Sequence, residues 1–138
     1  MTNRFAAAIA IFAASMLALA GCQSKTYNNS GGSGGKSASL RAMEQVAIAA
    51  HKCWFASRDP AFKEYQMANE LNNFGGTPRF LLVPAKHYGG RPLLVVQATG
   101  NSSRVEVFGP LMDGPLSGRI AADIARWQGG GGSCSSTG

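Results

Sequence analysis

The sequence predicts an α+β domain: a small antiparallel sheet of three to four strands, flanked by an N-terminal and a C-terminal helix in the order α-β-β-β-β-α and linked by a disulfide. Two segments with helical periodicity enclose a middle section of short β-rich runs, each bounded by Gly, Pro or Asn. The connections between those runs are short enough to join antiparallel neighbours.

The first helix is predicted at residues 39–54, with Ser39 as a candidate N-cap. Apolar side chains recur there at three- and four-residue intervals. The stripe consists of Leu40, Met43, Ala47, Ala50 and Trp54. His51 is a candidate general base, but no second titrating partner stands at a readable spacing. A histidine at the helix end, meeting the terminal carbonyl dipoles, is therefore the favoured interpretation.

Four strands are expected between the helices. A turn followed by a strand near residues 65–72 is favoured over a helical turn at residues 61–65, and the clearest β-runs cover residues 79–83, 91–98 and 104–108. The runs at 79–83 and 91–98 are continuously apolar, which predicts that both of their faces are covered. The run at 104–108 alternates, as expected for a strand with one wet face. Gly100-Asn101 is expected to supply the positive φ angles of a tight turn.

The last helix is expected after residues 109–114, with Asp113 or Gly114 as its cap, Pro115 in its first turn and Gly129 at its end. Its apolar stripe consists of Leu116, Ile120, Ile124 and Trp127. The scattered acidic residues are predicted to be solvated charges, among them Glu64, Glu70, Glu106, Asp113 and Asp123.

The N-terminus has the pattern of a secretory signal. An apolar run at residues 5–19 follows a single basic residue, Arg4. A membrane-spanning helix needs about 20 apolar residues, and no Lys/Arg cluster follows to stop transfer, so residues 1–21 are predicted to be cleaved. The segment Leu19-Ala20-Gly21-Cys22 resembles the lipobox of bacterial lipoproteins. An ordinary cleaved signal, with Cys22 merely close to the cleavage site, is the alternative.

The resemblance implies that the Cys22 sulfur carries a diacylglyceryl group and that its amine is acylated, by fatty acids such as palmitate. Each CH₂ group buried in the bilayer contributes about 0.8 kcal/mol to membrane binding, so several acyl chains together form a stable anchor. Gln23 stands where lipoproteins retained in the inner membrane usually carry Asp, which favours the outer membrane. Residues 22–38 are predicted to be a lipidated flexible tether, residues 39–135 a single domain and residues 136–138 a disordered tail.

Cys53 and Cys134 remain once Cys22 is assigned to the lipid, and we predict that they are bonded because exported compartments oxidise thiols. The bond would tie the tail to the end of the first helix and place both helices on one side of the sheet. In the chain-entropy model, the disulfide stabilises the folded state by about 4.5 kcal/mol. A redox or nucleophilic thiol is the alternative, but the chain has no C-x-x-C motif.

Composition and net charge limit the classes of partner and cofactor that we expect for this protein. The net charge is +6, or +5 without the leader, which favours anionic lipid headgroups, lipopolysaccharide or acidic polymers. There is no dense Lys/Arg block and no basic strand interleaved with aromatic residues, so we expect no nucleic-acid binding. Two histidines and two widely spaced cysteines predict no metal site, and nothing in the chain indicates another cofactor.

Two catalytic motifs are matched by chance in the Gly-rich tether. Residues 31–35 fit G-x-S-x-G, but no strand precedes them to form a nucleophile elbow. Residues 34–37 imitate the end of a phosphate-binding loop, but Ser30 occupies the place of its first glycine. Neither a nucleophile–base pair nor a suitably spaced pair of carboxylates is present, so the protein is not predicted to be an enzyme.

One possible anion-binding cluster is predicted at the hairpin joining the strands near residues 79–83 and 91–98. It comprises Arg79, Lys86, His87, Tyr88 and Arg91. If the hairpin gathers them, these donors and the aromatic ring suit an anionic sugar, phosphate or carboxylate. The alternative is a solvated loop whose charges protect a sheet edge from aggregation.

These observations predict a lipid-anchored lipoprotein of the bacterial cell envelope, exported to the periplasm, with the outer membrane as the favoured location. It would act as a non-enzymatic structural or interaction module whose partner is an envelope protein or an anionic glycan or lipid. The alternative is a small ligand-binding or inhibitor-like domain that uses the basic hairpin. The folded part also resembles small uncharacterised lipoproteins of proteobacteria in residues 53–55, 81–84 and 108–112, a likeness that implies no known activity.

Overall fold

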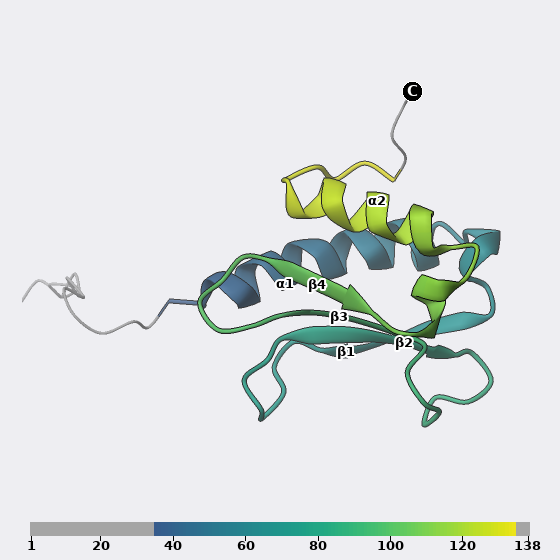
Figure 1. Cartoon of the computed structure of the whole chain (residues 1–138), viewed down its shortest axis with the longest axis horizontal. Coiled ribbons are helices and arrows are strands. Elements are labelled where there is room, and N and C mark those ends of the chain that lie inside the picture. The colour runs from purple at the N-terminus through teal and green to yellow at the C-terminus, as the bar shows by residue number, and fades with distance from the viewer. Residues whose placement is uncertain (1–34, 135–138) are drawn as a thin grey trace, which may run out of the picture. The chain divides into compact units, whose positions relative to one another are not determined.

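The computed structural model describes residues 35–134 (Figure 1). The predicted α+β class and order of elements are confirmed. The elements are α1 (Ala38–Ala50), β1 (Tyr65–Glu70), β2 (Arg79–Pro84), β3 (Leu94–Ala98), β4 (Val105–Phe108) and α2 (Ser117–Gln128). The predicted leader, the predicted lipid attachment at Cys22, most of the predicted tether and the predicted tail lie outside the described residues.

The sheet has four antiparallel strands in the order β1-β2-β3-β4. Both helices lie over the same face of this sheet, as expected, and they pack against each other (Figure 1). α1 packs on β3 and β4, and α2 packs on β4. The disulfide between Cys53 and Cys134 is confirmed, with a Cα–Cα distance of 4.9 Å. It joins the end of the first helical run to the segment that follows α2.

The core lies between the helices and the sheet, and aromatic rings fill its centre. The Trp54 ring stacks on Phe62 with 4.5 Å between ring centroids and lies 5.1 Å from the ring of Trp127. All three side chains are fully buried. Because aromatic side chains bury the largest apolar areas, this cluster adds a buried contact between the π-helical turn at His51–Ala56 and α2 to the packing of α1 against α2.

The first helical run differs from its prediction at both ends. The N-cap is Ser37, whose hydroxyl accepts a hydrogen bond from the Leu40 amide at 3.1 Å. The predicted cap, Ser39, is instead buried and donates to the Gly100 carbonyl oxygen at 2.6 Å, which ties α1 to the β3–β4 loop. The π-helical turn, His51–Ala56, continues the run beyond the predicted end. His51 is the C-cap residue of α1, as the helix-end interpretation expects, but the helical run continues through the π-helical turn and does not stop there.

Three of the four strands are shorter than expected, whereas β2 extends one residue further, to Pro84. The predicted turn before β1 is a 3₁₀ turn, Pro60–Phe62. β3 begins at Leu94 rather than at residue 91, because Pro92 has no amide hydrogen to contribute to the ladder. Along β3 buried and half-buried side chains alternate, so the prediction that both of its faces are covered is wrong. In β2 that prediction is correct, since residues 80–83 are all buried.

The approach to α2 also differs from the prediction. Asp113 and Gly114 do not cap the helix: Asp113 ends a 3₁₀ turn, Pro110–Asp113, and α2 begins three residues after Gly114, without a side-chain cap. Gly129 follows the last helical residue, as expected. Gly100 has the predicted positive φ, +63°, but Asn101 does not. The connection from residue 99 to 104 is longer than a tight two-residue turn, so one left-handed residue suffices.

Candidate functional site

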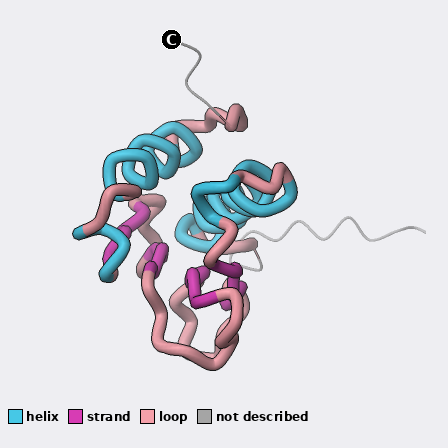
Figure 2. Tube along the Cα trace, turned by 90° about the vertical axis from the view of Figure 1, so that its right-hand side faces the viewer, coloured by secondary structure: helices cyan, strands magenta, loops and turns pink. Residues whose placement is uncertain are grey.

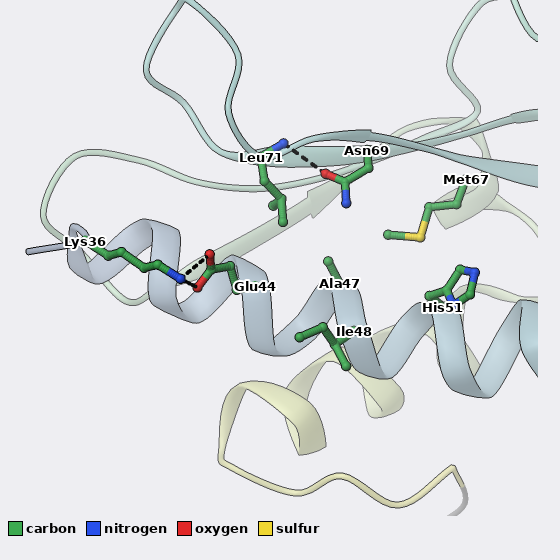
Figure 3. Close-up of a pocket in the computed structure, with 8 residues that line it drawn as sticks. All are labelled: Lys36, Glu44, Ala47, Ile48, His51, Met67, Asn69 and Leu71. Carbon is green, nitrogen blue, oxygen red and sulfur yellow. Dashed lines mark hydrogen bonds and ion pairs between the residues drawn. The ribbon is translucent and has the colours of Figure 1, made fainter.

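A groove of about 570 Å³ runs between α1 and the edge strand β1 (Figure 3). Side chains from both elements line it, and Lys36, which precedes α1, stands at one end. The other lining residues are Glu44, Ala47, Ile48, His51, Met67, Asn69 and Leu71. No local sequence pattern predicts this site, because the groove depends on how the helix crosses the sheet.

The position of α1 leaves the groove open. α1 packs mainly over β3 and β4, whereas β1 lies at the far edge of the sheet. Successive strand residues point to opposite faces, so Met67, which pairs with the buried Leu82, faces the helix layer. Asn69 faces the same way and is exposed. The helix-facing side of β1 is thus only partly covered.

The charges of the groove are confined to its ends. At one end the Lys36 ammonium group pairs with the Glu44 carboxylate at 2.7 Å. His51 is exposed at the other end (Figure 3). Between them the lining is mainly apolar, and Ile48 is 69% exposed. The groove therefore suits an apolar segment better than an anion.

β1 also offers a free backbone edge to this site. It is the terminal strand of the sheet, and no further strand among residues 35–134 pairs with its outer side. Its sequence, Tyr65–Glu70, contains neither Lys nor Pro, the residues that commonly protect an exposed edge. An extended peptide is therefore able to add to the sheet here and place alternate side chains in the groove.

The predicted basic cluster is only partly assembled, and the inclusion of Arg79 was wrong. Arg79 begins β2, whereas the loop carrying the other four residues follows the last residue of the same strand. Six strand residues extend about 17 Å, which separates Arg79 from that loop. Its guanidinium instead pairs with Glu70 of the neighbouring strand at 2.5 Å.

The other members of the cluster share one loop, residues 85–93. Lys86, His87, Tyr88 and Arg91 are all exposed there. Within residues 35–134 neither Lys86 nor Arg91 forms an ion pair with an acidic side chain. Binding of an anion by these four residues stays a prediction.

Asp123 was predicted to be solvated, and that prediction is wrong. This residue of α2 is 2% exposed and accepts a hydrogen bond from the Trp54 indole nitrogen at 2.8 Å. Arg119 donates to it at 3.1 Å, and the guanidinium of Arg126 also pairs with it. The carboxylate thus joins α2 to the π-helical turn, and its role is structural.

The network continues to the 3₁₀ turn before β1. Arg119 also pairs with Asp59 at 2.7 Å, and Asp59 accepts a hydrogen bond from the Ala61 amide at 2.9 Å. The Ala61 hydrogen bond is the main reason that the pKa of Asp59 is lowered, with a further contribution from Arg119. The hydrogen bond to Asp59 in turn raises the pKa of Arg119.

Comparison with protein-family models, curated proteins and solved structures identifies no relative. No family model, curated protein or solved structure matches this chain. Within residues 35–134, no group of three or more His, Cys, Asp or Glu side chains is arranged to hold a metal ion. Neither α-helix of that part is long and apolar enough to cross a membrane. The candidate function rests on the chain's own residues.

Proposed function

We propose that the protein is a lipid-anchored lipoprotein of the bacterial cell envelope and acts there as a non-enzymatic interaction module. The observation that carries this proposal is the segment Leu19-Ala20-Gly21-Cys22 at the end of an apolar run. The Cys53–Cys134 disulfide supports it, because such bonds persist in oxidising, exported compartments and are rare in the cytosol.

The proposed tether keeps the module near its membrane. The chain between Cys22 and the first described residue, Gly35, is rich in Gly and Ser. A flexible chain of this length has an average reach of about 20 Å. A partner of the module therefore lies close to the bilayer, which Gln23 suggests is the outer membrane.

The anchor is tested by labelling cells with a radioactive fatty acid while they express either the wild type or Cys22→Ala. The wild type is expected to take up the label and sediment with membranes, whereas Cys22→Ala is expected to do neither, because the acceptor sulfur is gone. Ser24→Ala, two residues away, is the matched control and is expected to behave as the wild type. Label on Cys22→Ala, or its absence from the wild type, contradicts the anchor.

We place the partner of the module at the groove between α1 and β1. The occupant that fits is an extended segment of an envelope protein: its backbone pairs with β1, and its apolar side chains lie against Ile48 and Met67. The unprotected edge of β1 supports this choice, because an exposed edge without blocking residues is a template for strand pairing.

Site-specific photocrosslinking tests the groove. A photoreactive residue at Ile48 is expected to crosslink one envelope protein, whereas the same residue at the exposed Ala122 of α2 is expected to give no such product. Adding Met67→Lys is expected to abolish the Ile48 product, because an inward-pointing lysine blocks strand addition. An unchanged thermal melting temperature serves as the folding control. Crosslinking that is equal at both positions, or that resists Met67→Lys, contradicts this assignment.

A further inference from the structure

Large apolar side chains are exposed mainly on one side of the domain. Four are exposed among residues 35–134: Ile48, Phe74, Tyr88 and Phe108. Ile48 belongs to the groove on α1. Phe74 and Tyr88 lie in the loops 71–78 and 85–93, and both loops extend on the side of the sheet opposite α1 and α2 (Figures 1 and 2).

Phe108 lies on the same side, on the open face of the sheet. Its cross-strand partner is Val95, and strand alternation turns both away from the face that carries the buried Val96. No helix among the described residues covers this open face (Figure 2). The Phe108 side chain is 47% exposed, and that of Phe74 is fully exposed.

The charged residues of the two loops are all basic. Loop 85–93 carries Lys86 and Arg91, loop 71–78 carries no charged residue, and neither loop contains an acidic residue. In the sequence, Tyr88 lies between these two basic residues, and its side chain is 63% exposed. Exposed aromatic rings beside lysine and arginine are typical of surfaces that meet the headgroups of an anionic bilayer.

We propose that this loop face, defined by loops 71–78 and 85–93 together with Phe108, docks onto an anionic lipid bilayer. Phe74 and Tyr88 enter the headgroup layer, and Lys86 and Arg91 pair with lipid phosphates. The inference deepens the proposed function by naming the side of the domain that faces the membrane. It depends on the proposed function only for the identity of the membrane that the loop face contacts.

The shape of the loop face favours a bilayer over a protein partner. A stable protein interface buries at least about 1,000 Å² of closely packed surface. Here the aromatic side chains project from separate loops that leave opposite ends of β2. Two isolated loop tips contact a planar, deformable lipid surface more readily than a complementary protein patch.

Vesicle sedimentation of the mature chain carrying Cys22→Ser tests the contact without the lipid anchor. The protein is expected to bind vesicles of phosphatidylglycerol and phosphatidylcholine, to bind phosphatidylcholine alone weakly, and to dissociate as salt rises. Lys86→Ser with Arg91→Ser is expected to weaken binding about 25-fold, from the attraction of two cations to the anionic surface. Phe74→Ser with Tyr88→Ser is expected to weaken it about tenfold.

Matched controls separate this docking from general attraction of a basic protein. Arg41→Ser with Lys52→Ser removes the same charge from α1 and the π-helical turn that follows it, and Ile48→Ser removes an exposed apolar side chain from the helix side. Both are expected to bind within about twofold of the parent, because surface changes away from a contact have small effects. Equal losses in loop and control variants overturn the proposal.

Two further results have distinct meanings. Self-association that is lost in Phe74→Ser with Tyr88→Ser would show that the loop face joins two copies of the chain, and this also overturns the proposal. Vesicle binding by a protein that fails the fatty-acid labelling test would overturn the anchor while leaving the loop face as a membrane contact. If the wild type takes up the fatty-acid label but the Cys22→Ser chain does not bind vesicles, the anchor stands and the loop-face proposal is overturned.

Discussion

Replacing Cys53 and Cys134 together with serine is expected to lower the free energy of unfolding by about 4.5 kcal/mol, because the closed loop of the disulfide restricts the unfolded chain. The bonded residues are 81 positions apart, which makes the loss of chain entropy large. A domain of this size has a total stability of about 5–15 kcal/mol, so the variant is expected to be marginally folded at best.

The folded geometry has other support near this bond, so the effect is expected to arise mainly in the unfolded state. The carbonyl oxygen of Ser133 accepts hydrogen bonds from the Trp127 indole at 2.9 Å and from Arg126 at 3.1 Å. These contacts hold the segment after α2 in place without the disulfide.

Urea unfolding followed by tryptophan fluorescence measures the loss. The wild type in reductant is the control and is expected to unfold at the same midpoint as the double serine variant. If the variant unfolds at the midpoint of the oxidised wild type, the disulfide contributes nothing to stability and the loop-closure explanation is wrong.

Replacing Asp123 with alanine is expected to cost about 3 kcal/mol, because the Trp54 indole then loses its buried acceptor and two arginines lose their shared carboxylate. Arg119 remains paired with Asp59 and partly exposed, which keeps the loss below that of a fully buried ion pair. Asp123→Asn is expected to cost roughly half as much, because the amide oxygen still accepts one hydrogen bond.

The same urea titration measures both Asp123 variants. Asp113→Ala is the matched control: this acidic residue is exposed, so its replacement is expected to change stability by less than about 0.5 kcal/mol. Equal midpoints for Asp123→Ala and Asp113→Ala would show that the buried carboxylate does not stabilise the contact between α2 and the π-helical turn.

The strands and the disulfide could be predicted because their signals are local or compositional. Alternation and bounding Gly or Pro residues define β4 and β2 within a few positions. The burial of Asp123 was missed although a signal was present: it lies three residues from Ile120 and four from Trp127, on the same helical face as the apolar stripe. Arg119 and Arg126 flank it at spacings that allow ion pairs.

Tertiary geometry explains the remaining differences. Arg79 was grouped with the loop 85–93 because it lies at one end of a strand that this loop joins, but it is the far end, and an extended strand holds its two ends far apart. The groove beside β1 exists because α1 crosses the sheet over β3 and β4. No local pattern in the chain specifies that placement, since several helix positions would bury the same apolar stripe.

The position of the disulfide makes most of the domain a covalent ring. All four strands and α2 lie in the chain between Cys53 and Cys134. A protease that cuts once in an exposed loop, such as residues 71–78 or 85–93, opens the ring but releases no fragment. Under oxidising conditions the nicked molecule keeps its mass apart from one added water, and its two pieces separate only after reduction.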